Sequence, residues 1–200
     1  LHPMKLLKKF LLLASVYLIG CGGCSVHQSN VNETIGIGQT HQGGIIFYLY
    51  QEGDIGYIEG EQHGLIAAPS DQSKSAIWGW NDTKISTAEG IIMGTGLKNT
   101  LDIIAGYSEA GIAAALCHRL FLEGYDDWFL PSKNELNLMY RNIGKGNSLG
   151  LGNIGGFVNG NYWSSTQYNE YDAWEQNFGY GYQTPINKYG TKYVRAIRAF

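Results

Sequence analysis

The sequence predicts an α+β domain that follows an export signal and a polar tether. Strand-like segments at both ends of the predicted domain flank two helix-like segments in its middle. Strands, then helices, then strands is the order typical of α+β domains, whereas α/β folds alternate the two. The chain also combines 28 glycines with 13% aromatic residues. This composition indicates long irregular loops held by aromatic clusters rather than a helical bundle.

The first residues have the pattern of a bacterial lipoprotein signal. After Met4, the predicted start, three lysines precede an apolar run over residues 10–19. The run is too short for a bilayer, which needs roughly 20 apolar residues, but it suits a signal peptide. It ends in Leu-Ile-Gly-Cys at residues 18–21, which matches a lipobox. We therefore predict a signal peptide over residues 1–20, lipidation of Cys21, and a location in the cell envelope, at the outer membrane or cell surface.

The segment behind the signal is predicted to be a flexible tether over residues 21–39, because it is rich in Ser, Asn, Gly and Gln. Three of the 14 basic residues and none of the acidic ones precede Cys21, so 11 basic residues face 17 acidic ones after export. An acidic chain without a basic stripe is not expected to bind nucleic acid.

The alternative to a lipoprotein signal is an ordinary secretory signal in which Cys21 occupies its position by chance.

Local patterns predict the strands of the domain, which we place at residues 40–200. β-branched and aromatic residues predict two opening strands joined by a glycine-rich hairpin loop, a short buried strand before the second helix, and further strands near the end. The ranges are 43–50, 64–69, 128–131, 162–166, 173–178 and 193–200.

Two helices are predicted between these strands. Apolar side chains at three-and-four spacing predict the first over residues 100–122, broken near Gly106. The second begins at Ser132, which forms a capping box with Glu135 three residues later. Irregular loops are expected over residues 77–100 and 145–161.

The sequence contains no set of residues typical of catalysis or of a metal site. It lacks the HExxH, GxSxG and phosphate-loop patterns. Cys117 and His118 are neighbours on the predicted helix, where adjacent side chains do not face each other, so they do not form a nucleophile and its base. Cys117 is expected to be a buried apolar residue, with a Cys24–Cys117 disulfide as the alternative. Asp126-Asp127 suits a turn better than a cation site. We therefore expect no enzyme activity, no cofactor and no metal.

The segment from Tyr162 to Phe200 contains seven of the 14 tyrosines, interleaved with Asn and Gly. Tyr gives a large contact area at low entropic cost, and Asn and Gly give adaptable polar contacts, as in antibody loops. A Tyr-rich core is the alternative, but residues 167–189 contain few aliphatic side chains. We expect exposed loops over residues 167–190 to bind a ligand. The candidate residues are Tyr168, Asn169, Tyr171, Asp172, Glu175, Asn177, Tyr180, Tyr182, Thr184, Asn187 and Tyr189.

Four blocks of sequence resemble one bacterial family, in the same order. They are GIIFY at 44–48 with HGLIAAPS at 63–70, GYDDWFLPSKNEL at 124–136, YWSST at 162–166, and YVRAIRAF at 193–200. Over about residues 38–200 the chain resembles the Legionella collagen-like protein C-terminal domain, a domain of unknown function. The resemblance implies a C-type-lectin-like fold related to formylglycine-generating enzymes. In such folds the first and last strands pair, here 44–50 beside 193–200, and the loops bind the ligand.

The ending also resembles the variable proteins of diversity-generating retroelements. There, copying errors at adenines rewrite scattered codons, so that AAY codons for Asn become Tyr, Asp, Ser, Thr, Gly or Ile codons. Most candidate residues belong to this set, as do Ile186 and Gly190, whereas Glu170, Glu175 and Gln183 do not. Diversification of the loops is therefore a hypothesis for this chain.

The sequence as a whole predicts a surface-displayed lipoprotein, held to the membrane by its lipid, that binds a protein or glycan on another cell, a phage or a host. There are two alternatives. An enzyme of the formylglycine-generating type would use a reactive cysteine pair and a metal, but the predicted domain contains only Cys117. A structural envelope lipoprotein would have no soluble ligand.

Overall fold

The computed structural model of the protein describes residues 35–80 and 83–200. The predicted signal peptide, the predicted lipidation site Cys21, and Cys24 lie outside these residues. Residues 35–39 belong to the domain and not to the predicted tether. The Gly38 N–H donates to the Ile46 carbonyl at 2.8 Å, and Ile37 packs against buried apolar residues. The domain therefore begins about five residues before the predicted boundary.

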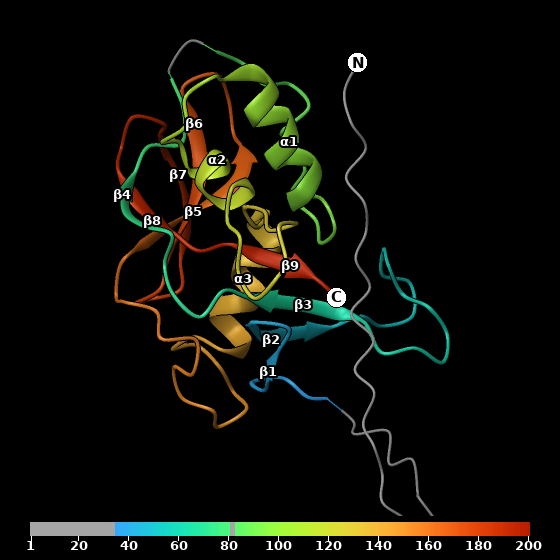
Figure 1. The fold of residues 1–200 in the computed structure, drawn as a ribbon. Coiled ribbons are helices and arrows are strands. Elements are labelled where there is room, and N and C mark those ends of the chain that lie inside the picture. The colour runs from blue at the N-terminus through green and yellow to red at the C-terminus, as the bar shows by residue number, and fades with distance from the viewer. Residues whose placement is uncertain (1–34, 81–82) are drawn as a thin grey trace, which may run out of the picture. The chain divides into compact units, whose positions relative to one another are not determined.

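The described residues form two sheets and three helices, which confirms the α+β class (Figure 1). The first sheet is antiparallel and has the order β1-β2-β3-β9. Its strands are β1 (Thr40–His41), β2 (Gly44–Leu49), β3 (Gly64–Ala67) and β9 (Ile197–Ala199). The second has the order β4-β8-β5-β6-β7, and only β5 and β8 run parallel. Its strands are β4 (Ser73–Ala76), β5 (Asn161–Gln167), β6 (Asp172–Asn177), β7 (Gln183–Asn187) and β8 (Lys192–Val194).

The expected pairing of the first and last strands is wrong in its detail. The last strand, β9, pairs with β3, and β3 separates it from β2. The β2–β3 hairpin fills one edge of β2 and β1 fills the other, so the edge of β3 is the one left for β9. The lectin-like fold stays a prediction from the resemblance.

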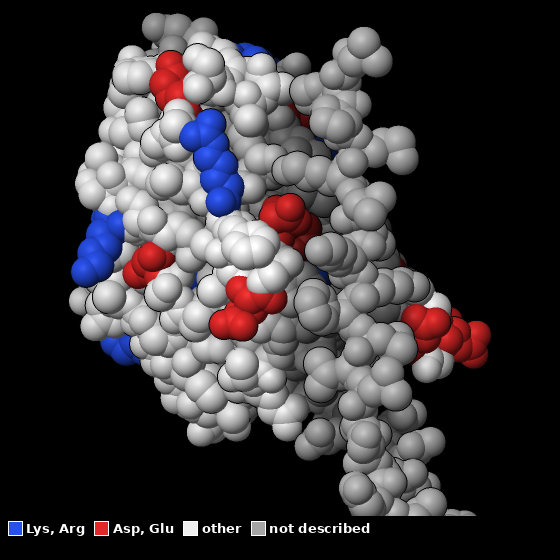
Figure 2. Space-filling view, in the orientation of Figure 1, with Lys and Arg blue, Asp and Glu red and all other residues white. Residues whose placement is uncertain are grey.

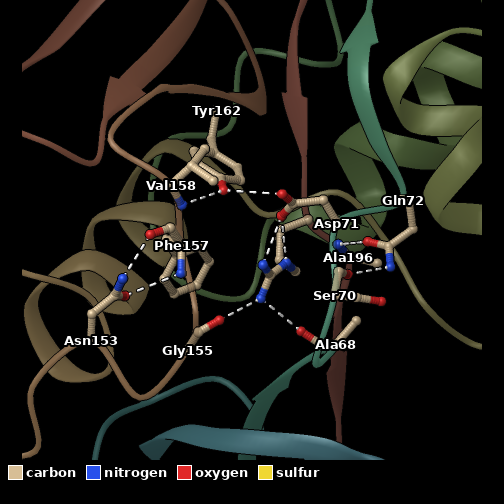
Figure 3. Close-up of polar contacts among 11 residues, drawn as sticks. Ala68, Ser70, Asp71, Gln72, Asn153, Gly155, Phe157, Val158, Tyr162 and Ala196 are labelled. Atoms are coloured by element: carbon tan, nitrogen blue, oxygen red, sulfur yellow. Dashed lines mark hydrogen bonds and ion pairs between the residues drawn. The ribbon is translucent and has the colours of Figure 1, made fainter.

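The predicted single strand at 193–200 is also wrong, because the chain changes sheets between β8 and β9. Arg195 lies at this change and is buried. Its guanidinium lies 2.7 Å from Asp71 and donates to the Ala68 and Gly155 carbonyls, at 3.0 and 2.8 Å (Figure 3). It also lies 4.4 Å from the centre of the Phe157 ring. These contacts take Arg195 out of both ladders and fix the point where the chain crosses over.

The helices are α1 (Gly96–Gly106), α2 (Ala113–His118) and α3 (Lys133–Asn142). The predicted break at Gly106 is confirmed, although α1 begins four residues before the predicted start. The capping box of α3 is confirmed as well. The buried Glu135 carboxylate accepts N–H groups from Ser132 at 2.6 Å and from Gly94 at 2.8 Å, which ties the start of α3 to the start of α1. None of the described helices is long and apolar enough to cross a membrane.

Gly96 is expected to tolerate no side chain, because it lies against this capping box. A Cβ there would lie 2.2 Å from Glu135 Oε2 and 2.9 Å from the Ser132 nitrogen. Overpacking of this kind costs about 1–3 kcal/mol, so G96A should lower the free energy of urea unfolding by about that amount. G111A is the matched control, since a Cβ at Gly111 meets nothing within 4 Å. Equal stability of the two variants would contradict this role of Gly96.

The buried apolar side chains of the described residues form two clusters. One surrounds Trp78, Trp128 and Trp163 and includes buried residues of α1 and α2. The other includes Phe47 of β2, Met139 of α3 and the Phe178 ring. β6 and β7 continue the second sheet to its edge (Figure 1), and Ala173 of β6 belongs to the first cluster.

Candidate ligand-binding surface

The predicted binding loops contain a strand that the sequence did not indicate. Residues 183–187 form β7, which pairs with β6 from Asp172 opposite Asn187 to Gln176 opposite Gln183. Pro185 has no N–H to donate, and it is tolerated because β7 is an edge strand. The expectation of loops over this stretch is therefore wrong, and the candidate residues are distributed along a hairpin.

The hairpin divides the candidate tyrosines into two groups. Tyr168 and Tyr171 lie in the turn between β5 and β6, and Tyr189 follows β7 at the same end. Tyr180 and Tyr182 lie in the turn at the other end, which we call the far turn. The six residues of β6 separate the two ends by about 17 Å.

The first end carries a fourth aromatic side chain that the sequence did not single out. The ring of Tyr189 lies 5.4 Å from that of Trp80, and the ring of Tyr168 lies 5.5 Å from that of Trp174. The four outer side chains are substantially exposed, at 40% for Trp80, 54% for Tyr168, 47% for Tyr171 and 46% for Tyr189. We call these four residues the aromatic end. A Trp within a stretch expected to be irregular was the only sign in the sequence that Trp80 could belong to a binding surface.

The asparagine side chains accept hydrogen bonds from backbone N–H groups of the turns, so these oxygens are not free to contact a ligand. The Asn169 side-chain oxygen accepts the N–H groups of Tyr171 and Asp172, at 2.8 and 2.7 Å. Asn187 accepts the Tyr189 N–H at 3.0 Å. Asn side chains commonly stabilise turns in this way. Asn169 and Asn187 therefore hold the backbone that presents the tyrosines.

The remaining candidate residues also lie at different places along the hairpin. At the far turn, Asn177 accepts the N–H groups of Gly179 and Tyr180, both at 2.9 Å. Asp172 accepts the Asn169 amide at 3.2 Å, and Thr184 lies in the middle of β7. The structure thus groups Tyr168, Tyr171 and Tyr189 with Asn169, Asp172 and Asn187, and leaves Asn177, Tyr180, Tyr182 and Thr184 apart from them.

Glu175 does not lie among the exposed candidates, because it is only 3% exposed. Alternate residues of a strand point to opposite faces, and Glu175 points inward. The Lys192 ammonium lies 2.8 Å from its carboxylate, and the Asn161 amide donates to it at 2.7 Å. Glu175 is therefore part of the interior.

A buried lysine joins the segments of the aromatic end. Lys188 is fully buried, and its ammonium donates to the Thr83 carbonyl at 2.9 Å, the Gln167 side-chain oxygen at 2.8 Å and the Glu170 carbonyl at 2.9 Å. These acceptors belong to the segments that follow Trp80 and that flank Tyr168. Lys188 itself directly precedes Tyr189, so one side chain links all three segments. No local sequence pattern indicates this role.

Comparison with family models tests the resemblance that the four sequence blocks indicate. The model of the Lcl C-terminal domain matches residues 68–198. The chain belongs to the Lcl C-terminal domain family. The match begins about 30 residues after the predicted start of the resemblance, and it contains the β6–β7 hairpin, Lys188 and Arg195. Comparison with curated proteins gave no significant match.

The buried Lys188 should make the stability of this Lcl C-terminal domain depend on pH. Burial lowers the pKa of Lys188 from 10.5 to about 8, although the charges of Asp172 and Glu170 act in the opposite direction. Between these two pH values the unfolded chain keeps the proton and the folded chain loses it, so the Lys188 contribution to stability rises with pH.

From pH 7.5 to 9.5 this contribution should rise by about 2 kcal/mol. Cys117 acts the other way, because burial raises its pKa. The measurement is therefore the difference between wild type and K188M in urea unfolding at both pH values, since both proteins retain Cys117. A difference that does not change with pH would contradict a neutralised Lys188.

The described part of the Lcl C-terminal domain shows how its metal-ligating and thiol side chains are placed. Within residues 35–80 and 83–200, no three His, Cys, Asp or Glu side chains converge as metal ligands would. Cys117 is fully buried, whereas His118 is exposed, so the two side chains point apart. On the face drawn in Figure 2, acidic and basic side chains are scattered among uncharged ones. The exposed aromatic residues are thus the main chemical feature of the hairpin.

Proposed function

We propose that this protein is an envelope lipoprotein whose Lcl C-terminal domain binds a protein or glycan ligand through the aromatic end. The observation that carries the proposal is the exposure of Trp80, Tyr168, Tyr171 and Tyr189 on turns that Lys188 and Asn169 hold in place. Tyr and Trp dominate the energetics of many interfaces. A rigid aromatic surface also loses little entropy on binding. The family assignment is consistent with a surface-associated binding role.

The aromatic end is a better candidate than the far turn. Two of its rings already pack against another aromatic ring, Tyr189 on Trp80 and Tyr168 on Trp174. These contacts restrict the rings before any ligand arrives. Tyr180 of the far turn, by contrast, is 84% exposed and would have to be ordered on binding.

The binding proposal is tested by screening the full chain against a glycan array and a phage-displayed library of folded domains. The variant Y168A/Y171A/Y189A serves as the comparison. We expect retained glycans or domains whose affinity falls by about 100-fold or more in the variant, since truncating hot-spot residues costs about 2 kcal/mol or more each. Equal binding of both proteins to every retained ligand would remove the aromatic end as the site.

The display part of the proposal rests on the lipobox at Cys21. Cells that express the full chain are labelled with radioactive palmitate and separated into membrane and soluble fractions. We expect label and membrane association in the wild type and neither in C21S. Label in C21S would show that Cys21 is not the site of lipidation.

Diversification by a retroelement remains part of the proposal and has its own test. A reverse-transcriptase gene and a near-copy of the 3′ end should lie beside the gene. The structure adds an expectation about which residues would vary among diversified copies. Replacing Asn169, Asn177 or Asn187 removes a turn contact, so variation should concentrate at the exposed tyrosines. A neighbourhood without these elements would remove the hypothesis.

A further inference from the structure

We propose that a polar hollow beside the far turn binds the carboxylate of a small hydroxylated ligand. The hollow has a volume of about 310 Å³ and lies between the chain before β5, the end of β6 and the start of β8. The side chains that matter for the argument are Lys74, Asn159, Asn161, Asn177, Thr191 and Lys192. This site goes beyond the aromatic end, which lies at the opposite end of β6.

Hydrogen bonds in the wall of the hollow fix the orientation of two amides. The Gly179 and Tyr180 N–H groups donate to the Asn177 side-chain oxygen, and the Asn177 amide donates to the Asn161 oxygen. The Asn161 amide in turn donates to the buried Glu175 carboxylate at 2.7 Å. The side-chain oxygens of Asn161 and Asn177 are therefore occupied by protein donors. Each amide group has two N–H bonds, and within the described residues Asn161 and Asn177 each use one of them, so the second is available to a ligand.

The charges of the hollow favour an anion. Lys74 and Lys192 each contribute a positive charge, and among the described residues the carboxylate that contacts this wall is that of Glu175. Glu175 is buried and lies 2.8 Å from the Lys192 ammonium, so it balances one of the two charges. One net positive charge remains, together with amide and hydroxyl donors. A carboxylate carries one negative charge and accepts hydrogen bonds through both oxygens, which matches this set.

The size and walls of the hollow indicate a ligand larger than a bare ion. Pockets of about 300 Å³ are at the small end of the range for organic ligands. Tyr193 forms part of the wall, and its ring is held 5.2 Å from that of Tyr162. A ring fixed in this way offers an apolar surface beside the donors. The shared chemistry is thus a carboxylate on a hydroxylated carbon skeleton, either an acidic sugar or a free hydroxy acid.

The test is an NMR titration of the ¹⁵N-labelled full chain, followed at the side-chain amide signals of Asn161 and Asn177. The probes are sodium glucuronate, sodium lactate, glucose and inorganic phosphate. We expect saturable shifts with the two carboxylates, and the tighter of them identifies an acidic sugar or a hydroxy acid as the source. Glucose should bind at least about tenfold more weakly, because hydrogen bonds to charged groups are about twice as strong as neutral ones.

Two exposed lysines provide matched variants for this titration. K74Q removes a charge from the hollow and should weaken carboxylate binding by about threefold or more, the range of an exposed ion pair. K145Q removes an exposed charge from another loop and should leave the affinity unchanged. No saturable shift with either carboxylate would overturn the proposal, and so would equal binding of glucose or tighter binding of phosphate. Because the titration uses none of the aromatic-end residues, failure of one site leaves the other intact.

Discussion

Replacing Arg195 by Met is expected to lower the free energy of unfolding by about 3–5 kcal/mol, the usual cost of removing one partner of a buried ion pair. Arg195 is 2% exposed and lies 2.7 Å from Asp71, whose side chain is 12% exposed. The substitution would leave this carboxylate without its cation, and the Ala68 and Gly155 carbonyls without a donor. It would also loosen the crossover between the two sheets.

Urea unfolding measures this effect, and R195K is the informative comparison. Lys keeps the charge but cannot reach all the acceptors of the planar guanidinium, so R195K should lie between wild type and R195M. D71N should cost less than R195M, since its amide can still accept from the guanidinium. A loss below about 1 kcal/mol in R195M would show that the network in Figure 3 contributes little to stability.

Replacing Lys188 by Met is expected to have the second-largest effect, a loss of about 2–4 kcal/mol in stability together with weaker ligand binding. The carbonyls of Thr83 and Glu170 and the side-chain oxygen of Gln167 would each lose a buried donor. An unsatisfied buried polar group costs about 1–3 kcal/mol, although relaxation and the removal of a buried charge recover part of the sum.

The effect of K188M on binding separates it from an ordinary stability variant. At a temperature where the variant remains folded, its affinity for a ligand from the screen should fall, because the segments that carry Trp80, Tyr171 and Tyr189 are no longer joined. K145M, which changes an exposed lysine elsewhere, should match the wild type. Unchanged affinity in folded K188M would mean that the aromatic end is ordered without Lys188.

Local patterns predicted the parts of the fold that depend on local interactions. The α3 capping box needs only Ser132 and Glu135, three residues apart, and the structure contains it as expected. The break of the first helix at Gly106 and the strands β2, β3 and β5 also follow from residues close in sequence. The resemblance identified the family, which the match over residues 68–198 confirms.

The remaining features depend on contacts between distant residues. The split between β8 and β9 follows from Arg195 meeting Asp71, which is 124 residues away. Burial of Glu175 depends on Lys192 and Asn161, and the place of Lys188 depends on Thr83, 105 residues before it. A count of Tyr and Asn singled out this segment as a candidate, but it could not show that its asparagines stabilise turns while its tyrosines divide between two ends.

The measurement that tests the proposed binding site most directly is the dissociation constant of one retained ligand for two variants of the full chain. Y168A/Y171A/Y189A changes the aromatic end, and Y180A/Y182A changes the far turn, about 17 Å away. We expect the first variant to lose about 100-fold or more in affinity and the second to stay within about threefold of the wild type. The reverse order would place the ligand at the far turn and contradict the proposed site.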